Sequence, residues 1–184
     1  MFRKIGNCIL KLRIKGMQWK KIGKFHIDKG FNIIGAKYIS IGNDFYAGEN
    51  LRLQAWDKYE NQSFTPILII GSEVSMMENC QISCCNKILI GDGCLFGANV
   101  FMTDNFHGDN SIAQCSIAPI KRQLKVKKPI KIGKNVWIGR NVCIMPGVNI
   151  GDGAVVGANS VVTHDIPSLC VAVGIPAKMI KRID

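Results

Sequence analysis

The most regular stretch of the chain is a run of six hexapeptides, residues 132–167, in which apolar positions recur every six residues. The first position of each hexapeptide is aliphatic: Ile132, Ile138, Ile144, Ile150, Val156 and Val162. The fifth position is also small or apolar: Val136, Val142, Val148, Ala154, Ser160 and Ile166. An α-helix places apolar residues every 3.6 positions and a half-buried strand every second one, so a period of six fits neither. This period is typical of a parallel β-helix, in which a short strand and a turn repeat around a solenoid.

The same period runs less regularly through the preceding part of the chain and defines its organisation. It begins near Ile27, is broken at residues 54–69 and again at residues 103–129, and ends near residue 167. We therefore predict an N-terminal cap at residues 1–26, a β-helix domain at 27–167 with two inserted loops, and a C-terminal tail at 168–184. Insertions in solenoids tend to lie on the binding face, and a long loop in a compact domain is usually functional. Trp56, Tyr59 and Phe64 indicate that the first loop is ordered.

Composition and charge narrow the classes of partner. The chain is 47% hydrophobic and 20% charged, as in globular domains, and we expect neither a membrane-spanning helix nor a signal peptide. Its net charge of +11 is concentrated, because residues 1–24 carry eight Lys or Arg and residues 121–131 carry six, with no acidic residue in either segment. Such runs favour an anionic partner, namely a phosphorylated cofactor, an acidic glycan or a membrane surface. Nucleic acid is disfavoured, because no aromatic interleaving or binding motif accompanies the charge.

The basic N-terminal segment has two interpretations that the sequence leaves open. Ile5, Ile9, Leu12 and Ile14 form an apolar stripe among basic residues. Capping the open end of the solenoid is the favoured role, since terminal repeats need a polar cover. Peripheral membrane contact through residues 1–24 requires the same basic amphipathicity. The expected location is therefore cytoplasmic, with the inner face of the membrane as the alternative.

Cysteine and histidine do not form recognisable ligand motifs. The eight cysteines include no C-x-x-C pair, and several occupy small apolar positions of the repeat, which favours reduced core thiols. The three histidines, His26, His107 and His164, lie one in each third of the chain. We therefore predict no metal site.

Several motifs, in this order, resemble the hexapeptide-repeat acyltransferases, the left-handed β-helix family. They are TDNFHG at 103–108, VWIGRNV at 136–142, MPGV at 145–148, GANSVVT at 157–163 and GIPAK at 174–178. The likeness is greatest to O-acetyltransferases of capsule, lipopolysaccharide and exopolysaccharide synthesis and to the maltose and galactoside acetyltransferases. The resemblance implies an all-β fold, a left-handed parallel β-helix with an inserted catalytic loop. The left hand comes only from the resemblance, because parallel crossovers are generally right-handed.

The resemblance also implies an activity and partners. The family transfers an acetyl group from acetyl-CoA directly to a hydroxyl or amine, without a metal, and works as a homotrimer with each active site between two neighbouring coils. We expect an O-acetyltransferase acting on a sugar or glycan hydroxyl in a surface polysaccharide or its lipid-linked precursor. The alternatives are N-acetyl transfer to an aminosugar nucleotide, O-acetyl transfer to serine, a non-catalytic trimeric scaffold and, last, a metal hydratase.

The loop motif carries the expected catalytic base. His107 of TDNFHG matches the family's catalytic histidine, and an imidazole with an ordinary pKa near 6.5 can accept the proton of an attacking hydroxyl. Asp104 is expected either to orient His107 or to form a turn. The acceptor-binding asparagine of the sugar acetyltransferases aligns with Met77 here, so the neighbouring Asn79 is a substitute candidate for substrate binding.

The remaining candidates come from the regular repeat and the tail. Trp137 is expected to face outward, where the resemblance implies that it lines the acceptor site; a packing contact between subunits is the alternative. The backbone N–H of Arg140 matches the family's donor to the thioester oxygen. Gly139 would keep that approach open, or serve only the geometry of the corner. The expected contacts to CoA are Ala158 and Thr163 along the pantetheine and Lys178 and Lys181 at the phosphates, which makes residues 168–184 a CoA-binding tail.

Overall fold

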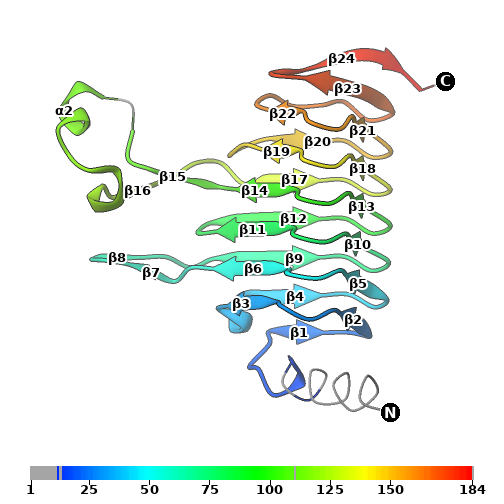
Figure 1. Cartoon of the computed structure of the whole chain (residues 1–184), viewed down its shortest axis with the longest axis horizontal. Coiled ribbons are helices and arrows are strands. Elements are labelled where there is room, and N and C mark those ends of the chain that lie inside the picture. The colour runs from blue at the N-terminus through cyan, green and yellow to red at the C-terminus, as the bar shows by residue number, and fades with distance from the viewer. Residues whose placement is uncertain (1–11, 13, 110, 184) are drawn as a thin grey trace.

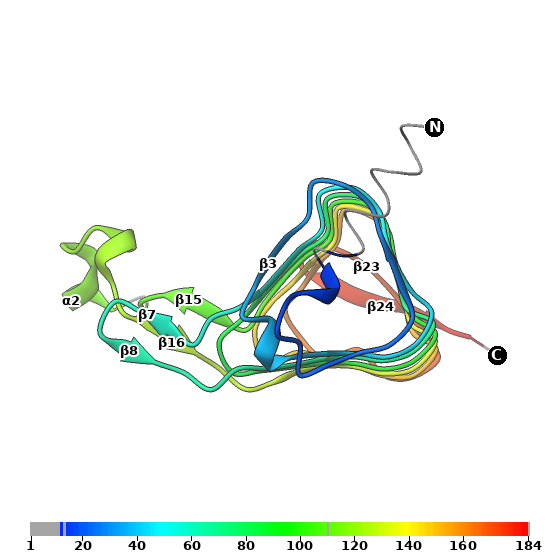
Figure 2. The ribbon, with the colours of Figure 1, turned by 90° about the horizontal axis from the view of Figure 1, so that it is seen from below.

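The chain folds as a parallel β-helix with a triangular cross-section, as the computed structural model shows for residues 12, 14–109 and 111–183 (Figures 1 and 2). Each coil adds one strand to each of three sheets. The expected fold class, an all-β left-handed parallel β-helix, is confirmed. Sheet A contains β1 (Lys21–Ile22), β4 (Ile39–Ile41), β9 (Ile67–Ile70), β12 (Lys87–Ile90), β17 (Ile130–Ile132) and β20 (Asn149–Ile150).

The other two faces of the triangle are built in the same way. Sheet B contains β2 (Phe25–Ile27), β5 (Phe45–Ala47), β10 (Ser75–Met76), β13 (Leu95–Phe96), β18 (Trp137–Ile138), β21 (Val155–Val156), β23 (Cys170–Gly174) and β24 (Ala177–Arg182). Sheet C contains β3 (Asn32–Ile34), β6 (Arg52–Ala55), β11 (Gln81–Cys84), β14 (Phe101–Thr103), β19 (Cys143–Ile144) and β22 (Val161–Val162). Within each coil, the chain therefore contributes a strand first to sheet A, then to sheet B and then to sheet C.

The hexapeptide period corresponds to the inward-facing positions of these coils. All twelve residues at the first and fifth positions of the run 132–167 are buried. They stack in columns, as when Met102 pairs with Ile144 and Ile144 with Val162 along sheet C. Burying each aliphatic side chain contributes about 1.5–3 kcal/mol, so the repeated column is the main source of stability. Ser160 is the polar exception, and its hydroxyl accepts a hydrogen bond from the Gly174 N–H at 3.0 Å.

The corner between sheets B and C is fixed by a ladder of asparagines. Each member has a left-handed backbone with φ between 56° and 61°, which asparagine tolerates better than most residues. Each side-chain amide donates to the side-chain oxygen of the next member at 2.8–3.0 Å. The ladder runs through Asn50, Asn79, Asn99, Asn141 and Asn159.

Both ends of the helix extend beyond the predicted domain limits. β1 and β2 already pair with the second coil, so the solenoid begins at Lys21 rather than at residue 27. At the other end β23 continues sheet B, and β24 folds back antiparallel on it. Ile14 is fully buried and accepts a hydrogen bond from Trp19 Nε1 at 2.7 Å, whereas Leu12 is exposed. Ile5 and Ile9 of the expected cap lie outside the described residues. In the part that the structure describes, no helix has the length and apolar character needed to cross a membrane.

The seven cysteines among the described residues are free thiols; five are buried, Cys143 is partly buried and Cys115 is exposed. Burial raises the pKa of Cys80 to about 11 and, with the negative charge of Asp104 nearby, that of Cys85 to about 12. These thiols therefore remain protonated and unreactive at neutral pH.

Both insertions leave the helix at the corner between sheets C and A and form one projecting unit, which we call the arm (Figures 1 and 2). The first is the hairpin of β7 (Lys58–Tyr59) and β8 (Gln62–Ser63). The second contains β15 (Asn105–His107), α2 (Ile112–Cys115), η2 (Pro119–Lys121) and β16 (Leu124–Val126), with β15 antiparallel to β16. The Gln62 side chain joins the two, since its Nε2 donates to the Leu124 carbonyl at 3.0 Å and its Oε1 accepts the Leu124 N–H at 2.6 Å.

Candidate functional site

His107 lies at the end of β15, where the two insertions meet. Antiparallel pairing with Leu124 fixes its backbone, and its side chain is exposed. The imidazole borders a cavity of about 190 Å³ between the arm and sheet C. The cavity is lined by Gln54, Trp56, Tyr59, Ser83, Asn105, His107 and Leu124. Four segments that are distant in the sequence therefore converge on one histidine.

The first insertion supplies the closest partner of the imidazole. Tyr59 Oη lies 3.4 Å from His107 Nδ1, and the two rings meet edge to face with centroids 5.6 Å apart. The same phenol donates a hydrogen bond of 2.5 Å to the Ile120 carbonyl of the second insertion. The tyrosine thus connects the hairpin, the histidine and η2.

Apart from His107, the polar side chains that line this cavity are amides and hydroxyls. Asn105 Nδ2 lies 3.4 Å from the Ser83 hydroxyl and 3.2 Å from Asp104 Oδ1, which fixes the amide at the cavity wall. Gln54 is held by hydrogen bonds of 3.3 Å to Asn32 and Gln81. Trp56 is half-buried and adds an aromatic wall. Amides, a hydroxyl and an aromatic face suit a neutral ligand that carries hydroxyl groups.

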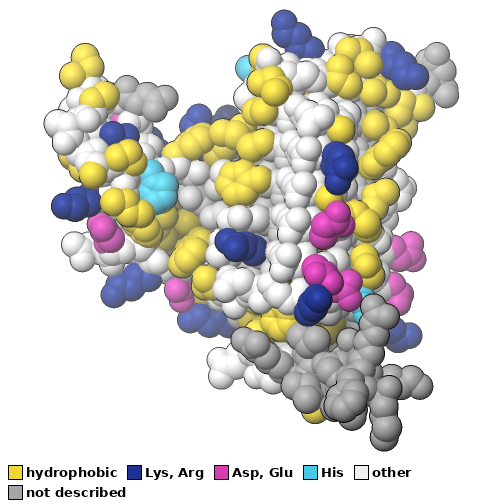
Figure 3. Space-filling view, viewed as in Figure 1, with side chains coloured by type: hydrophobic (Ala, Val, Ile, Leu, Met, Phe, Trp, Pro, Cys, Tyr) yellow, Lys and Arg dark blue, Asp and Glu magenta, His cyan; other side chains and the backbone are white. Residues whose placement is uncertain are grey.

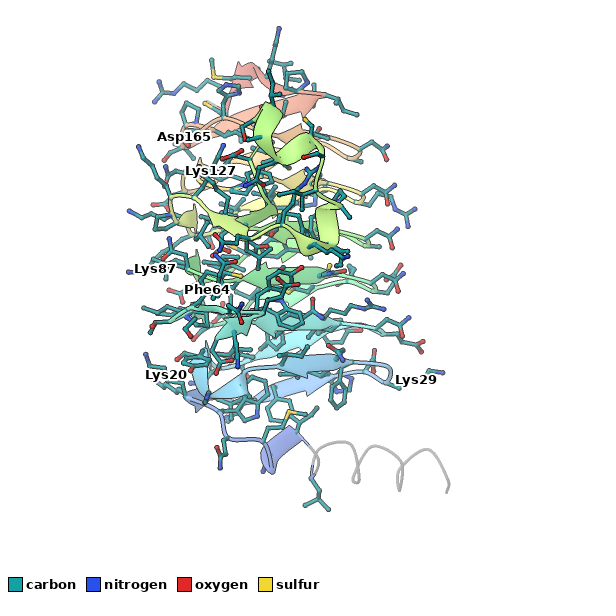
Figure 4. All side chains as sticks on the ribbon, turned by 90° about the vertical axis from the view of Figure 1, so that its left-hand side faces the viewer. Lys20, Lys29, Phe64, Lys87, Lys127 and Asp165 are labelled. Carbon is teal, nitrogen blue, oxygen red and sulfur yellow. The ribbon has the colours of Figure 1, made fainter. Side chains whose placement is uncertain are left out.

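His107 also lines a second, basic cavity of about 430 Å³. It is lined by Phe106, His107, Gly108, Asp109, Lys125 and Lys127. Lys127 Nζ lies 5.1 Å above the Phe106 ring, and Lys125 Nζ lies 3.4 Å from Asp109 Oδ2. In Figure 4, which looks onto the arm, labelled Phe64 marks the hairpin below and labelled Lys127 the second insertion above it. His107 therefore borders both a cavity with neutral polar groups and a cavity with a net positive charge.

Asp104 has a different role from the orientation of His107. Its side chain is fully buried and accepts the backbone N–H groups of Cys85, Asn86 and Lys87 at 2.8–2.9 Å. These bonds hold the corner between β11 and β12, one coil below. Among the described residues, the group at His107 Nδ1 is Tyr59, which corrects the expected pairing of Asp104 with His107 in favour of the turn-forming alternative.

Asn79 is likewise accounted for by the fold. Its amide group donates to Asn99 and its oxygen accepts from Asn50, both at 3.0 Å, in the ladder between sheets B and C. His107 lies on the arm at the corner between sheets C and A. Asn79 therefore lies away from His107 of the same chain, at the corner that also carries Arg140, and its expected role in substrate binding stays a prediction.

The expected donor-binding residues lie away from His107 in the same chain. Gly139, Arg140 and Ala158 occupy the corner between sheets B and C, and a Cβ at Gly139 would come within 2.6 Å of the Ala158 nitrogen. Within the described part of the chain, the Arg140 N–H has no hydrogen-bond acceptor, and those of Ala98 and Ala158 at equivalent turns have none either. An N–H group without an acceptor therefore recurs at this turn in successive coils and is not specific to Arg140.

The outward face of sheet B carries the remaining candidates. Trp137 is 55% exposed and lies between Leu95 and Val155 in an outward column of the sheet. Lys178 and Lys181 are exposed on β24 and pair with Val173 and Val171. Thr163 is instead at the corner between sheets C and A, where its hydroxyl lies 2.8 Å from His164 Nδ1. Figure 3 shows the Lys and Arg side chains over the arm and near both ends of the helix.

The structure thus divides the predicted site residues into two groups. One group lies at the corner between sheets C and A, where the arm leaves the helix: Asp104, His107 and Thr163. The other group lies on sheet B or at its corner with sheet C: Trp137, Gly139, Arg140, Ala158, Lys178 and Lys181. Sequence analysis missed Tyr59, Gln54, Ser83 and Asn105 as neighbours of His107. A signal existed, because both insertions interrupt the repeat after a sheet C strand and therefore had to project from the same corner.

The comparisons with known proteins agree with this architecture. A family model described as the hexapeptide repeat of succinyl-transferase matches residues 87–103 and 129–164. Comparison with curated protein sequences finds no match. A solved structure of a maltose O-acetyltransferase from Clostridium difficile 630 is 29% identical, with a TM-score of 0.61, over 91% of this chain and 71% of that one.

Two further structures share the fold at lower identity. The N-acyltransferase AntD from Bacillus cereus, in complex with dTDP and 3-hydroxybutyryl-CoA, has a TM-score of 0.77 at 23% identity over 95% of this chain and 88% of that one. A hexapeptide-repeat acetyltransferase from Vibrio cholerae in complex with acetyl coenzyme A has a TM-score of 0.63 at 23% identity over 96% and 78%. Both structures are of acyltransferases, and both hold an acyl-CoA.

Proposed function

We propose that this chain, a hexapeptide-repeat protein with the parallel β-helix fold of the acetyltransferases, transfers an acetyl group from acetyl-CoA to a hydroxyl of a sugar. The observation that carries the proposal is the position of His107, an exposed imidazole facing a neutral, partly aromatic cavity built by both insertions. The similarity to a maltose O-acetyltransferase supports both the acyl donor and the class of acceptor.

In this proposal His107 is the general base. His107 accepts the proton of the acceptor hydroxyl as that oxygen attacks the thioester carbonyl. The new C–O bond forms, the C–S bond breaks, and the imidazolium returns the proton to the departing CoA sulfur. Positioned proton transfer of this kind contributes about 10²–10⁴-fold to the rate.

The cavity favours a neutral acceptor. Asn105, Gln54 and Ser83 offer amide and hydroxyl groups to sugar hydroxyls, and Trp56 offers an aromatic face to the apolar side of a ring. In accord with the sequence resemblance, we place this sugar in a surface polysaccharide or its precursor and the reaction in the cytoplasm.

One observation favours a second candidate, N-acyl transfer to an aminosugar nucleotide. The basic cavity behind His107, with Lys125 and Lys127, suits a diphosphate, and AntD was solved with dTDP. The same cavity also suits the phosphates of CoA. A panel of acceptors that includes free sugars and aminosugar nucleotides separates the two candidates.

The separation of the predicted residues supports a site shared between copies. Trp137 and the Arg140 N–H are on sheet B and its corner, so they complete the site of His107 only from a second chain. We therefore propose a homotrimer in which the arm of one copy covers sheet B of the next, with Arg140 N–H stabilising the oxyanion. Gly139, Ala158, Thr163, Lys178 and Lys181 are proposed CoA contacts in this arrangement.

A thiol-release assay with acetyl-CoA and the acceptor panel tests the function. We expect His107→Ala to lower kcat about 10²–10⁴-fold with retained fold, because the general base is lost. His26→Ala is the matched control, since His26 is also exposed and bonded to Asp28 at 3.0 Å but lies on β2 in the first coil, separated by three strands of sheet B from Trp137 on β18. Full turnover by His107→Ala, or no CoA-dependent turnover with any acceptor, would contradict the proposal.

A further inference from the structure

We infer that Tyr59 is a positioning residue that holds His107 in the Nδ1–H tautomer, so that Nε2 presents its lone pair to the acceptor hydroxyl. The inference rests on the proposed function, in which His107 is the general base. It gives the hairpin of the first insertion a role in the chemistry, although this hairpin precedes the histidine by more than forty residues in the sequence.

The tautomer follows from counting donors. A phenol has one proton to donate, and Tyr59 Oη lies 2.5 Å from the Ile120 carbonyl oxygen, which can only accept. The Tyr59 hydroxyl therefore donates its single proton to the Ile120 carbonyl and has none left for His107. What the oxygen offers to His107 Nδ1, at 3.4 Å, is a lone pair, so Nδ1 must carry the proton. Catalytic hydrogen bonds are often long before substrate binds, and this one has room to shorten.

No carboxylate competes for this role among the described residues that line the two cavities beside the imidazole. Asp109, the acidic residue there, accepts from the Ser111 N–H at 3.0 Å and lies 3.4 Å from Lys125 Nζ. These bonds lower the pKa of Asp109, the bonds to Ser111 being the main cause. The other charged groups in the cavities are Lys125 and Lys127, whose ammonium groups are donors only and cannot accept a hydrogen bond from Nδ1–H.

The position of Tyr59 is secured at both ends of the hairpin. Gln62 pairs with Leu124 on the β16 side, as described above. At the base, Asp57 accepts from Tyr38 Oη and pairs with Lys37 Nζ, both at 3.0 Å. The hydrogen bond from Lys37 is the largest cause of the lowered pKa of Asp57. The phenol is therefore placed by a preorganised hairpin and not by the histidine itself.

Imidazole nitrogen NMR on the full chain with ¹⁵N-labelled histidine tests the inference directly. The chain has three histidines, and the His107→Ala spectrum assigns the resonances of His107. A free neutral imidazole prefers the Nε2–H tautomer. At a pH above the titration of the rings, we expect His107 in the wild type to show a protonated Nδ1 and an unprotonated Nε2. Tyr59→Phe should shift both nitrogens toward the averaged values of a free imidazole.

Tyr46→Phe is the matched control, since it removes a phenol that bonds to Asp28 at 3.4 Å on β5, without a contact to the hairpin or to His107. It should leave the His107 shifts unchanged. In turnover, Tyr59→Phe should lower kcat about three- to tenfold with little change in KM for acetyl-CoA, the size expected for one hydrogen bond. A wild-type His107 with a protonated Nε2, or shifts that Tyr59→Phe leaves unchanged, would overturn the inference. Because the spectra need no acetyl transfer, this result is independent of whether the proposed function is correct.

Discussion

Two residues of one motif, three positions apart, perform different work. His107 is exposed between two cavities, whereas Asp104 is fully buried. A buried carboxylate is stable only where donors replace water, and Asp104 has three backbone N–H groups at 2.8–2.9 Å. Asp104, at the start of the insertion, therefore closes the corner one coil below, whereas His107, within the arm, borders the two cavities.

This assignment predicts a stability effect for Asp104. Asp104→Ala should lower the free energy of unfolding by at least about 2 kcal/mol, because three donors lose their acceptor. Urea unfolding measures the loss. Asp109→Ala, in an exposed pair with Lys125, should change stability by no more than about 0.5 kcal/mol. Equal stability of Asp104→Ala and the wild type would show that the corner does not depend on the carboxylate.

At the scale of elements, the turns matter as much as the strands. Most strands of the regular run are only two residues long, so turn geometry must hold successive coils in register. The ladder between sheets B and C does this with left-handed asparagines that bond to one another from coil to coil. At the corner between sheets C and A, by contrast, two coils have no tight turn, because the chain leaves the helix there to form the arm and then returns.

The ladder gives Asn79 a test that distinguishes structure from substrate binding. Asn79→Ala should lower the free energy of unfolding by about 2–3 kcal/mol. The variant loses two side-chain hydrogen bonds and places alanine in a left-handed conformation, φ 60°, that asparagine tolerates better. Asn79→Gly should cost less, because glycine accepts that conformation. Thermal or urea unfolding ranks the variants, and both should keep the wild-type KM for the acceptor. A raised acceptor KM in Asn79→Gly would instead support a role of Asn79 in substrate binding.

The whole molecule is a triangular prism, and its shape decides which residues can cooperate. His107 projects from the corner between sheets C and A, whereas Trp137 and Arg140 belong to sheet B and its far corner (Figure 2). A rigid parallel β-helix cannot bend to bring these groups together. Their cooperation requires a second copy beside the first.

Mixing two impaired variants tests this arrangement. His107→Ala and Trp137→Ala, co-expressed with different tags and purified as mixed oligomers, should regain a fraction of wild-type turnover, because some interfaces combine an intact His107 with an intact Trp137. Each variant alone is the control, together with a mixture of two separately tagged His107→Ala chains, which should remain inactive. Mixed oligomers without recovered turnover would place the complete site within one chain.

The sequence by itself determined the repeated core, the two interruptions and the candidate base. These features are local in the sequence. The inward-facing residues recur every six positions from Ile132 to Ile166, and His107 belongs to the short motif TDNFHG. Tertiary structure alone decided that Tyr59 meets His107, that Asp104 binds the backbone of another coil and that Asn79 belongs to a ladder. Those contacts join residues from different coils, and only the stacking of the helix brings them within hydrogen-bond distance.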